Sequence, residues 1–134
     1  MEIGSKARVL LVDDQPNVRR TLCRILQPYP NIEVVGEAND GDEAVEAASK
    51  LQPTIVVMDI NMSKMDGITA TRLIKTQYPH VLVLGFSAEP KDYEVNAMKQ
   101  AGALDVLRIE DTTKDLYPAI QRALSSIESN LPEP

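Results

Sequence analysis

The carboxylates of this chain that could bind a metal ion come directly after two apolar runs. Asp59 ends the run TIVVMD at residues 54–59, and Asp13 and Asp14 follow the run RVLLV at residues 8–12. Continuous Val, Ile and Leu are typical of parallel strands that are buried on both faces of a sheet. Two such strands lying side by side would bring three carboxylates around one small space.

Three negative charges at such short range require compensation. Each pair repels by roughly 1–4 kcal/mol at a separation of about 4 Å near a protein surface, so the arrangement needs a bound cation or protonated acids. A small number of carboxylate oxygens suits Mg²⁺ or Mn²⁺ better than zinc. The sequence therefore predicts a Mg²⁺ (or Mn²⁺) site at one edge of a sheet.

The elements that would position these acids alternate regularly along the chain. Five apolar strand candidates are separated by amphipathic helical patterns, which indicates an α/β fold with one parallel sheet and right-handed crossovers. In such sheets, functional sites form beyond the carboxyl ends of the strands, where the strand order switches; Ser87 ends the fourth candidate. The expected strands are 8–12, 32–38, 54–59, 81–87 and 104–109, and the expected helices are 16–27, 42–51, 66–77, 91–101 and 113–127.

Several residues predict where the helices begin or end. Pro16 is acceptable in a first helical turn, Asp66 is expected to be the N-cap of the third helix, and Gly102 is expected to close the fourth. Pro118 belongs in a first turn because it lacks a backbone N–H, so the last helix is expected to start close to Asp115.

Composition bounds the functional class. The 134 residues, 43% hydrophobic and 25% charged, are those of one soluble globular domain. The formal net charge of −6 argues against direct nucleic-acid binding by this segment, because such binding requires a basic face. The single cysteine, Cys23, excludes an internal disulfide and favours a reduced, cytoplasmic protein. No apolar run is long enough for a membrane span. We expect a flexible N-terminus at residues 1–6, a domain at 7–127 and a tail or linker at 128–134.

Four motifs, in order and at suitable intervals, resemble the receiver domain of two-component response regulators. The resemblance covers about residues 7–127. The run DGITATRLIK is most similar to receivers of the nitrate-response type, and similar receivers also occur in hybrid sensor kinases. The resemblance implies a doubly wound, flavodoxin-like sheet of five strands in the order 2-1-3-4-5, with helices on both faces. The motifs are LLVDDQ (10–15), VVMDINMSKMDG (56–67), LGFSAE (84–89) and AGALDVL (101–107).

The resemblance also implies roles for the residues at the strand ends. Asp59 would be the phosphoacceptor, which takes a phosphoryl group from a sensor histidine kinase or a phosphotransfer protein. Asp14, Asp59 and the backbone carbonyl of Asn61 would bind Mg²⁺ directly, and Asp13 would hold the ion through water. The hydroxyl of Ser87 would hydrogen-bond a phosphoryl oxygen.

Asn61 and Glu89 would flank the phosphoryl group and modulate its hydrolysis, and hence the lifetime of the signal. Phosphorylation would change a surface formed by residues 91–101, 104–109 and 113–127. An output domain, another partner or a second copy of the chain would bind there.

The chain departs from the family pattern at two positions near its fifth strand. Receivers usually carry a lysine seven residues after the glycine of the AGA motif, and counting from Gly102 gives Ile109. The adjacent Arg108 is expected to point to the opposite face of the strand. Val106 stands where a Tyr or Phe usually swings inward. We therefore expect a receiver that accepts a phosphoryl group and transmits the signal weakly.

Other functional classes compete with this interpretation. A degenerate receiver, which binds a partner whatever the state of Asp59, would agree with Ile109 and Val106 but not with the acidic cluster. A Mg²⁺-dependent phosphatase needs a second carboxylate two residues after its nucleophile, where this chain has Asn61. Flavin binding needs a hydroxyl-rich phosphate loop after the first strand, where the segment DDQPN (13–17) is acidic. A non-enzymatic signalling domain is favoured.

Overall fold

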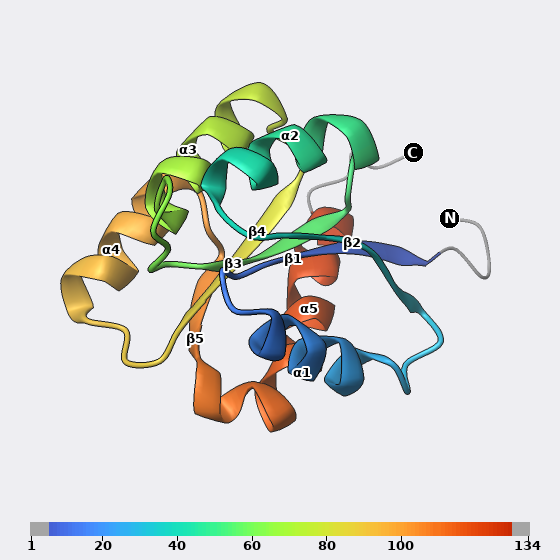
Figure 1. Ribbon diagram of the computed structural model, residues 1–134. Helices are drawn as coiled ribbons and strands as arrows, with labels where there is room; N and C mark the ends of the chain where they lie inside the picture. Colours follow the sequence, from blue (N-terminus) through green and yellow to red (C-terminus); the bar gives the residue numbers. More distant parts are fainter. Residues whose placement is uncertain (1–5, 130–134) are drawn as a thin grey trace.

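Alternating strands and helices build a parallel sheet that helices cover on both faces (Figure 1). The computed structural model describes residues 6–129. The expected N-terminus at 1–6 and tail at 128–134 lie almost wholly outside the described residues. The strands are β1 (Ala7–Val12), β2 (Ile32–Ala38), β3 (Ile55–Asp59), β4 (Leu82–Ser87) and β5 (Asp105–Arg108). The helices are α1 (Pro16–Leu26), α2 (Gly41–Leu51), α3 (Gly67–Gln77), α4 (Asp92–Ala101) and α5 (Thr112–Ser129), with a 3₁₀ turn η1 (Ile109–Asp111) before α5.

The sheet has the order β2-β1-β3-β4-β5, and every neighbouring pair is parallel. The expected flavodoxin-like topology is therefore confirmed. The strand order switches at β1 and β3, which lie side by side at the centre of the sheet. Val12 pairs with Met58, and Asp59 pairs with Phe86. In this register the carboxyl ends of β1, β3 and β4 lie next to one another at one edge of the sheet.

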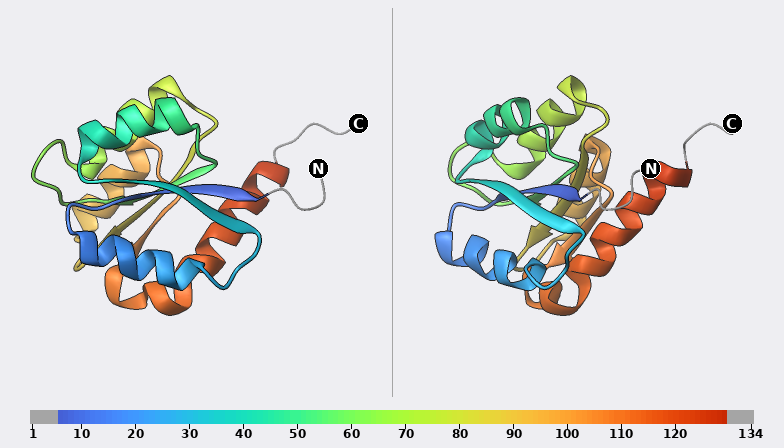
Figure 2. Two further views of the ribbon diagram at one scale, coloured as in Figure 1. Left: turned by 45° about the vertical axis from the view of Figure 1, so that its right-hand side comes forward. Right: turned by 90° about the vertical axis from the view of Figure 1, so that its right-hand side faces the viewer.

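Two hydrophobic clusters fill the spaces on either side of the sheet. Along β1, Val9 and Leu11 belong to the cluster beneath α1 and α5, whereas Leu10 and Val12 belong to the cluster beneath α2, α3 and α4. All four side chains are fully buried. Figure 2 shows the two helical layers from the side. Burial on both faces is the physical reason for the continuous apolar runs in the sequence.

The helix boundaries mostly follow the local signals. Pro16 occupies the first turn of α1. The Asp66 carboxylate caps α3 by accepting a hydrogen bond of 2.8 Å from the backbone N–H of Thr69. Gly102 closes α4 with a φ of 120°, a conformation that favours glycine. These three predictions are confirmed, and the other boundaries differ by one or two residues, as helix and strand ends commonly do.

The predicted start of the last helix near Asp115 is wrong. α5 begins at Thr112 and carries Pro118 in its interior, where the proline cannot donate to the carbonyl of Lys114. Thr112 and Leu116 are both buried, so the first turn packs against the core, and the burial of this turn offsets the missing hydrogen bond. Tertiary packing therefore overrides the local signal of the proline.

No helix within residues 6–129 combines the length and the apolar character that a membrane crossing requires.

Candidate metal centre

The carboxyl ends of β1 and β3 bring three carboxylates together. One oxygen each of Asp13, Asp14 and Asp59 lies within 4.8 Å of the others. Asp13 and Asp59 are buried, with 3% and 8% of their surface exposed, and Asp14 is exposed. The space between them is therefore open to solvent on the side of Asp14.

Backbone groups hold the two buried carboxylates in place. The N–H of Gln15 donates to Asp13 Oδ1 at 2.7 Å, and the N–H of Asn61 donates to Asp59 Oδ1 at 3.1 Å. Arg19 also fixes the end of β1, because its guanidinium donates to the backbone carbonyl of Asp13 at 2.5 Å and pairs with Glu37 at 2.7 Å. The backbone N–H groups of Gln15 and Asn61 both donate to Oδ1. The Oδ2 atoms of Asp13 and Asp59 receive no hydrogen bond from these two groups.

A close approach of α3 fixes the backbone of Asp59. A Cβ atom placed on Gly67 would lie 2.1 Å from the carbonyl oxygen of Asp59 and 2.9 Å from the Cα of Ile60. The N–H of Gly67 donates to the carbonyl of Ile60 at 2.9 Å. Only glycine allows the helix to begin against the end of β3 in this way.

The electrostatics of the cluster favour one bound proton or a cation. Burial, followed by the negative charge of Asp13, raises the pKa of Asp59 to about 8, although the N–H of Asn61 acts in the opposite direction. Burial also raises the pKa of Asp13. Two neighbouring buried carboxylates cannot both ionise without cost, so a cation that lies between them would lower both pKa values.

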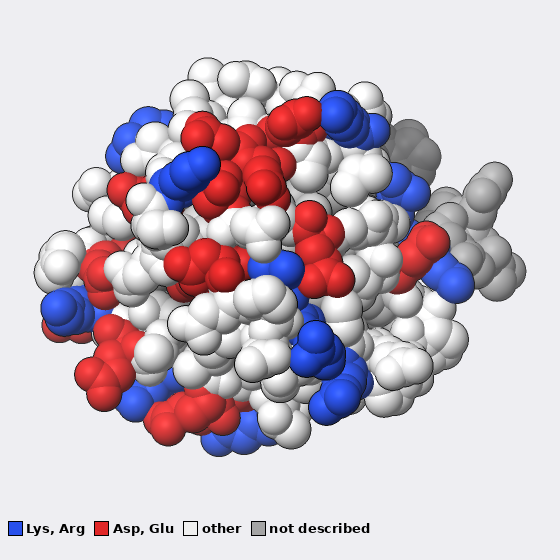
Figure 3. All heavy atoms as spheres, in the orientation of Figure 1, with Lys and Arg blue, Asp and Glu red and all other residues white. Residues whose placement is uncertain are grey.

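The donor set fits a hard divalent cation. Three carboxylates that converge within 4.8 Å offer only oxygen ligands, and the single cysteine, Cys23, does not belong to the cluster. Oxygen-only ligation with room for water suits Mg²⁺ or Mn²⁺. Figure 3 shows groups of acidic side chains on the face turned to the viewer, with Lys and Arg side chains among them. The net charge of −6 would favour the approach of cations.

Ser87 lies beside the acidic cluster at the end of β4. The residue is 3% exposed, and its hydroxyl accepts a hydrogen bond of 3.2 Å from the side-chain amide of Asn61. Both residues line a hollow of about 770 Å³ together with the three aspartates. The hydroxyl can still donate to an oxygen that enters this hollow.

The remaining predicted residues divide between the hollow and the core. Glu89 and Ile109 line the hollow, and Ile109 is half-buried against the cluster beneath α1 and α5. Val106 is not at the hollow, because it packs against the cluster on the opposite face of the sheet. Arg108 also points away from the hollow, and its guanidinium pairs with Glu110 at 2.8 Å.

Sequence reasoning missed several residues of the hollow, among them the three that lie at the start of α4. Lys91, Tyr93 and Glu94 line it from the start of α4. Their position shortly after Ser87 was the available signal. A short loop that leaves the end of β4 stays close to the site, so the residues that follow it can line the hollow. Among residues 6–129, Lys91 is the only basic residue that lines the hollow.

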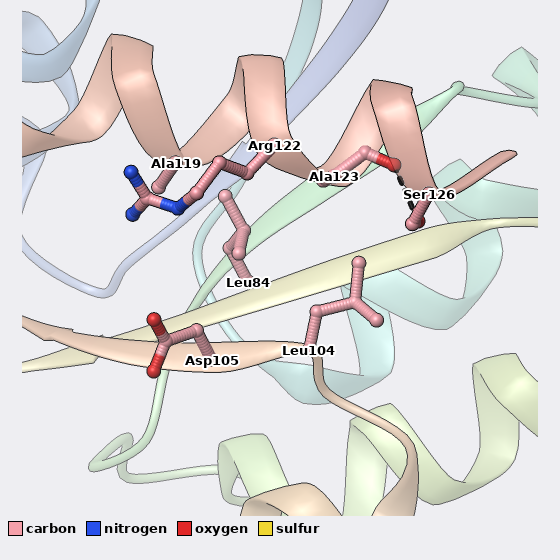
Figure 4. Close-up of a pocket in the computed structure, with 7 residues that line it drawn as sticks. All are labelled: Leu84, Leu104, Asp105, Ala119, Arg122, Ala123 and Ser126. Carbon is pink, nitrogen blue, oxygen red and sulfur yellow. Dashed lines mark hydrogen bonds between the residues drawn. The ribbon is translucent and has the colours of Figure 1, made fainter. Parts of the chain in front are cut away.

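A second, smaller pocket lies between β5 and α5 and contains none of the acidic cluster. Figure 4 shows Arg122 and Asp105 toward one end of the pocket and Leu84 and Leu104 beside them. Its volume is about 130 Å³. This pocket offers no group of carboxylates and is not a candidate for metal chemistry.

Comparisons with known proteins agree with this geometry. The response regulator receiver domain matches residues 9–121, so the chain belongs to this family. The response regulator domain of Thermotoga maritima CheB is 31% identical, with a TM-score of 0.84 over 90% of this chain and 97% of that chain. The signal receiver domain of NarL from Mycobacterium tuberculosis is 30% identical, with a TM-score of 0.83 over 88% of this chain and 95% of that one. The family predicted from the four motifs is confirmed.

Longer relatives contain a similar segment. Protein-glutamate methylesterase/protein-glutamine glutaminase 4 of Myxococcus xanthus is 45% identical over 102 residues, which are 75% of this chain and 29% of that protein. The transcriptional regulatory protein LiaR of Bacillus subtilis is 38% identical over 116 residues, which are 87% of this chain and 55% of that protein. The chain therefore spans only part of the length of these relatives.

Proposed function

We propose that this receiver domain accepts a phosphoryl group on Asp59 in a Mg²⁺-dependent phosphorelay. The donor is the phosphohistidine of a sensor histidine kinase or of a phosphotransfer protein. The observation that carries the proposal is the convergence of Asp13, Asp14 and Asp59 within 4.8 Å, beside the hydroxyl of Ser87.

In the proposed reaction, a carboxylate oxygen of Asp59 attacks the phosphorus atom. The new O–P bond forms an acyl phosphate as the P–N bond to the donor histidine breaks, and the leaving imidazole nitrogen takes up a proton. Asp14, Asp59 and the backbone carbonyl of Asn61 would hold the Mg²⁺, and Asp13 would hold it through water. When bound, the ion neutralises charge on the transferring oxygens.

Ser87 then connects phosphorylation to the surface of the domain. The phosphoryl group adds roughly one to two negative charges and several acceptor oxygens, and the Ser87 hydroxyl donates to one of them. In this switch Ser87 moves toward that oxygen and away from the amide of Asn61, and the end of β4 moves with it. The surface formed by α4, β5 and α5 responds and binds an output domain, a partner or a second copy. Asn61 and Glu89 control how readily water reaches the acyl phosphate.

The domain itself acts as a cytoplasmic signalling module over residues 7–127, without an enzymatic activity beyond its own phosphorylation and dephosphorylation. The methylesterase and transcriptional activities belong to the named relatives, of which this chain spans 29% and 55%. A DNA-binding or catalytic output would reside in a separate segment. The net charge of −6 supports a protein partner, because a protein surface that binds nucleic acid would be basic.

A phosphorylation-independent binding module is not favoured. Ile109 and Val106 agree with such a module, but three converging carboxylates repel one another, and a bound cation would offset that cost.

Labelling with radioactive acetyl phosphate and Mg²⁺ tests the proposal. The wild-type chain should take up label, and Asp59→Asn should abolish the uptake. Asp66→Asn is the matched control, because asparagine caps a helix as well as aspartate does and Asp66 lies outside the cluster. Equal labelling of the Asp59→Asn variant and the wild type would refute the proposal.

A further inference from the structure

The hollow beside Asp59 has a marked imbalance of charge. Among residues 6–129, five acidic residues line it and only one basic residue does. A phosphoryl group on Asp59 would carry roughly two negative charges in place of the single charge of the carboxylate while four other acids remain, whereas one divalent cation supplies two positive charges. A second cation is needed near the phosphoryl oxygens. The acidic residues are Asp13, Asp14, Asp59, Glu89 and Glu94.

We propose that Lys91, at the N-terminus of α4, is the phosphoryl-binding cation of this receiver. This inference rests on the proposed function and adds a residue to it. Position 109, on the opposite wall of the same hollow, holds an isoleucine and supplies no charge. The Lys91 ammonium would pair with a phosphoryl oxygen from the side of the loop that follows β4.

The backbone of Lys91 is held firmly at this position. Its N–H donates to the buried carboxylate of Glu94 at 3.1 Å, and its carbonyl accepts from the N–H of Val95 at 3.0 Å. The loop from Ser87 to Lys91 is only five residues long and includes Pro90, whose ring fixes φ. The flexible four-carbon side chain of Lys91 therefore extends from a fixed backbone beside the hollow.

Other cations near the site are already engaged. Arg19 is largely buried, with its guanidinium bound to Glu37 and to the carbonyl of Asp13. Arg108 is paired with Glu110 at 2.8 Å and does not line the hollow. Within residues 6–129, no ion pair or side-chain hydrogen bond involves the Lys91 ammonium, so it is available to a ligand in the hollow.

The side chain of Lys91 can be removed without loss of the helix cap. Both capping hydrogen bonds use backbone atoms of residue 91, and Lys91→Ala keeps those atoms. Thermal unfolding of the variant should therefore match that of the wild type. Lys99→Ala is the matched control, because Lys99 is exposed at the other end of α4 and does not line the hollow.

Titration with beryllofluoride and Mg²⁺, followed by amide spectra, tests the inference. Lys91→Ala should bind the mimic about tenfold more weakly than the wild type, as expected for a lost hydrogen bond to a charged group. Lys99→Ala should bind it with unchanged affinity. Lys91→Arg should retain most of the affinity.

A second variant separates a charge effect from a structural one. Ile109→Lys supplies an ammonium from the opposite wall, so Lys91→Ala should cost less than about twofold in this background if the two positions serve one ligand. A full tenfold loss in the Ile109→Lys background, or no loss in the wild-type background, would overturn the role of Lys91 and leave the proposed function standing. Failure of the wild type to bind the mimic would overturn both.

Discussion

The side-chain amide of Asn61 donates a hydrogen bond of 3.2 Å to the hydroxyl of Ser87, and this bond joins the loop after β3 to the end of β4. The proposed switch requires the hydroxyl to leave this partner. Asn61→Ala should therefore raise the affinity for beryllofluoride by about 2- to 10-fold, because one competing hydrogen bond of about 0.5–1.5 kcal/mol is removed. The exposed Asn96→Ala is the control for titrations followed by amide spectra. A weaker affinity in Asn61→Ala would show that the bond supports the bound state instead.

The raised pKa of Asp59 predicts how stability depends on pH. In the metal-free protein, burial and the charge of Asp13 raise this pKa from 3.8 to about 8. The folded state then binds the proton more tightly than the unfolded chain, so stability falls as pH rises from about 4 to about 8. Asp59→Asn lacks this group and should lose less stability over the same range. The melting temperatures of Asp59→Asn and the wild type are compared in EDTA at pH 5 and at pH 8. If the difference in melting temperature between the two proteins is the same at both pH values, the raised pKa of Asp59 is contradicted.

Magnesium should offset this loss of stability. Binding requires deprotonated carboxylates, so the affinity for Mg²⁺ should rise with pH over the same range. A concentration of 100 times Kd would stabilise the fold by about 2.7 kcal/mol. Thermal shift at pH 8 should show this gain in the wild type and in Asp42→Asn, which alters an exposed acid outside the cluster. Asp14→Asn should lose most of the gain; an undiminished shift in that variant would exclude Asp14 as a ligand.

Gly67 should be intolerant of any side chain. A Cβ there would lie 2.1 Å from the carbonyl of Asp59, so either α3 or the end of β3 must move. Gly67→Ala should cost about 3 kcal/mol of unfolding free energy and should weaken Mg²⁺ binding. Gly36→Ala is the control, because its Cβ would meet only side-chain ends, at 2.6 Å from Leu51 Cδ1 and at 3.6 Å from Leu10 Cδ1, and no backbone atom. Urea denaturation measures the unfolding free energy of both variants. Equal losses of unfolding free energy would show that the contact of Gly67 with Asp59 is not what makes glycine necessary.

Ile109→Lys should strengthen the response to phosphorylation. The side chain lines the hollow, so a lysine there would place a second ammonium near the phosphoryl group. We expect larger amide shifts in β4, β5 and α4 when beryllofluoride binds. Ile109→Met, which keeps the volume without the charge, should behave like the wild type. The same small shifts in both variants would show that position 109 is not what weakens the switch.

Much of the fold could be predicted from the sequence because the central strands β1, β3 and β4 are buried on both faces. This burial produces the continuous apolar runs at β1 and β3, and the acids that follow those runs must then meet at one edge of the sheet. The convergence of Asp13 and Asp59 is therefore a consequence of topology, whereas Ser87 was identified by its place at the end of β4.

The sequence could not predict features that depend on tertiary contacts. α5 starts at Thr112 despite Pro118, because Leu116 is buried in the core. Lys91 lines the hollow because Glu94 holds its backbone there. Its position shortly after Ser87 is a local signal, but that position alone does not show that the side chain reaches the hollow.

Trapping of the acyl phosphate tests the central claim most directly. The wild-type chain is incubated with acetyl phosphate and Mg²⁺ and reduced with borohydride, which converts an aspartyl phosphate to homoserine, and its peptides are then sequenced by mass spectrometry. The account predicts homoserine at position 59 alone, and none when Mg²⁺ is removed with EDTA. Phosphate found on another residue, such as His80 or Ser87, with aspartate intact at position 59 would contradict it.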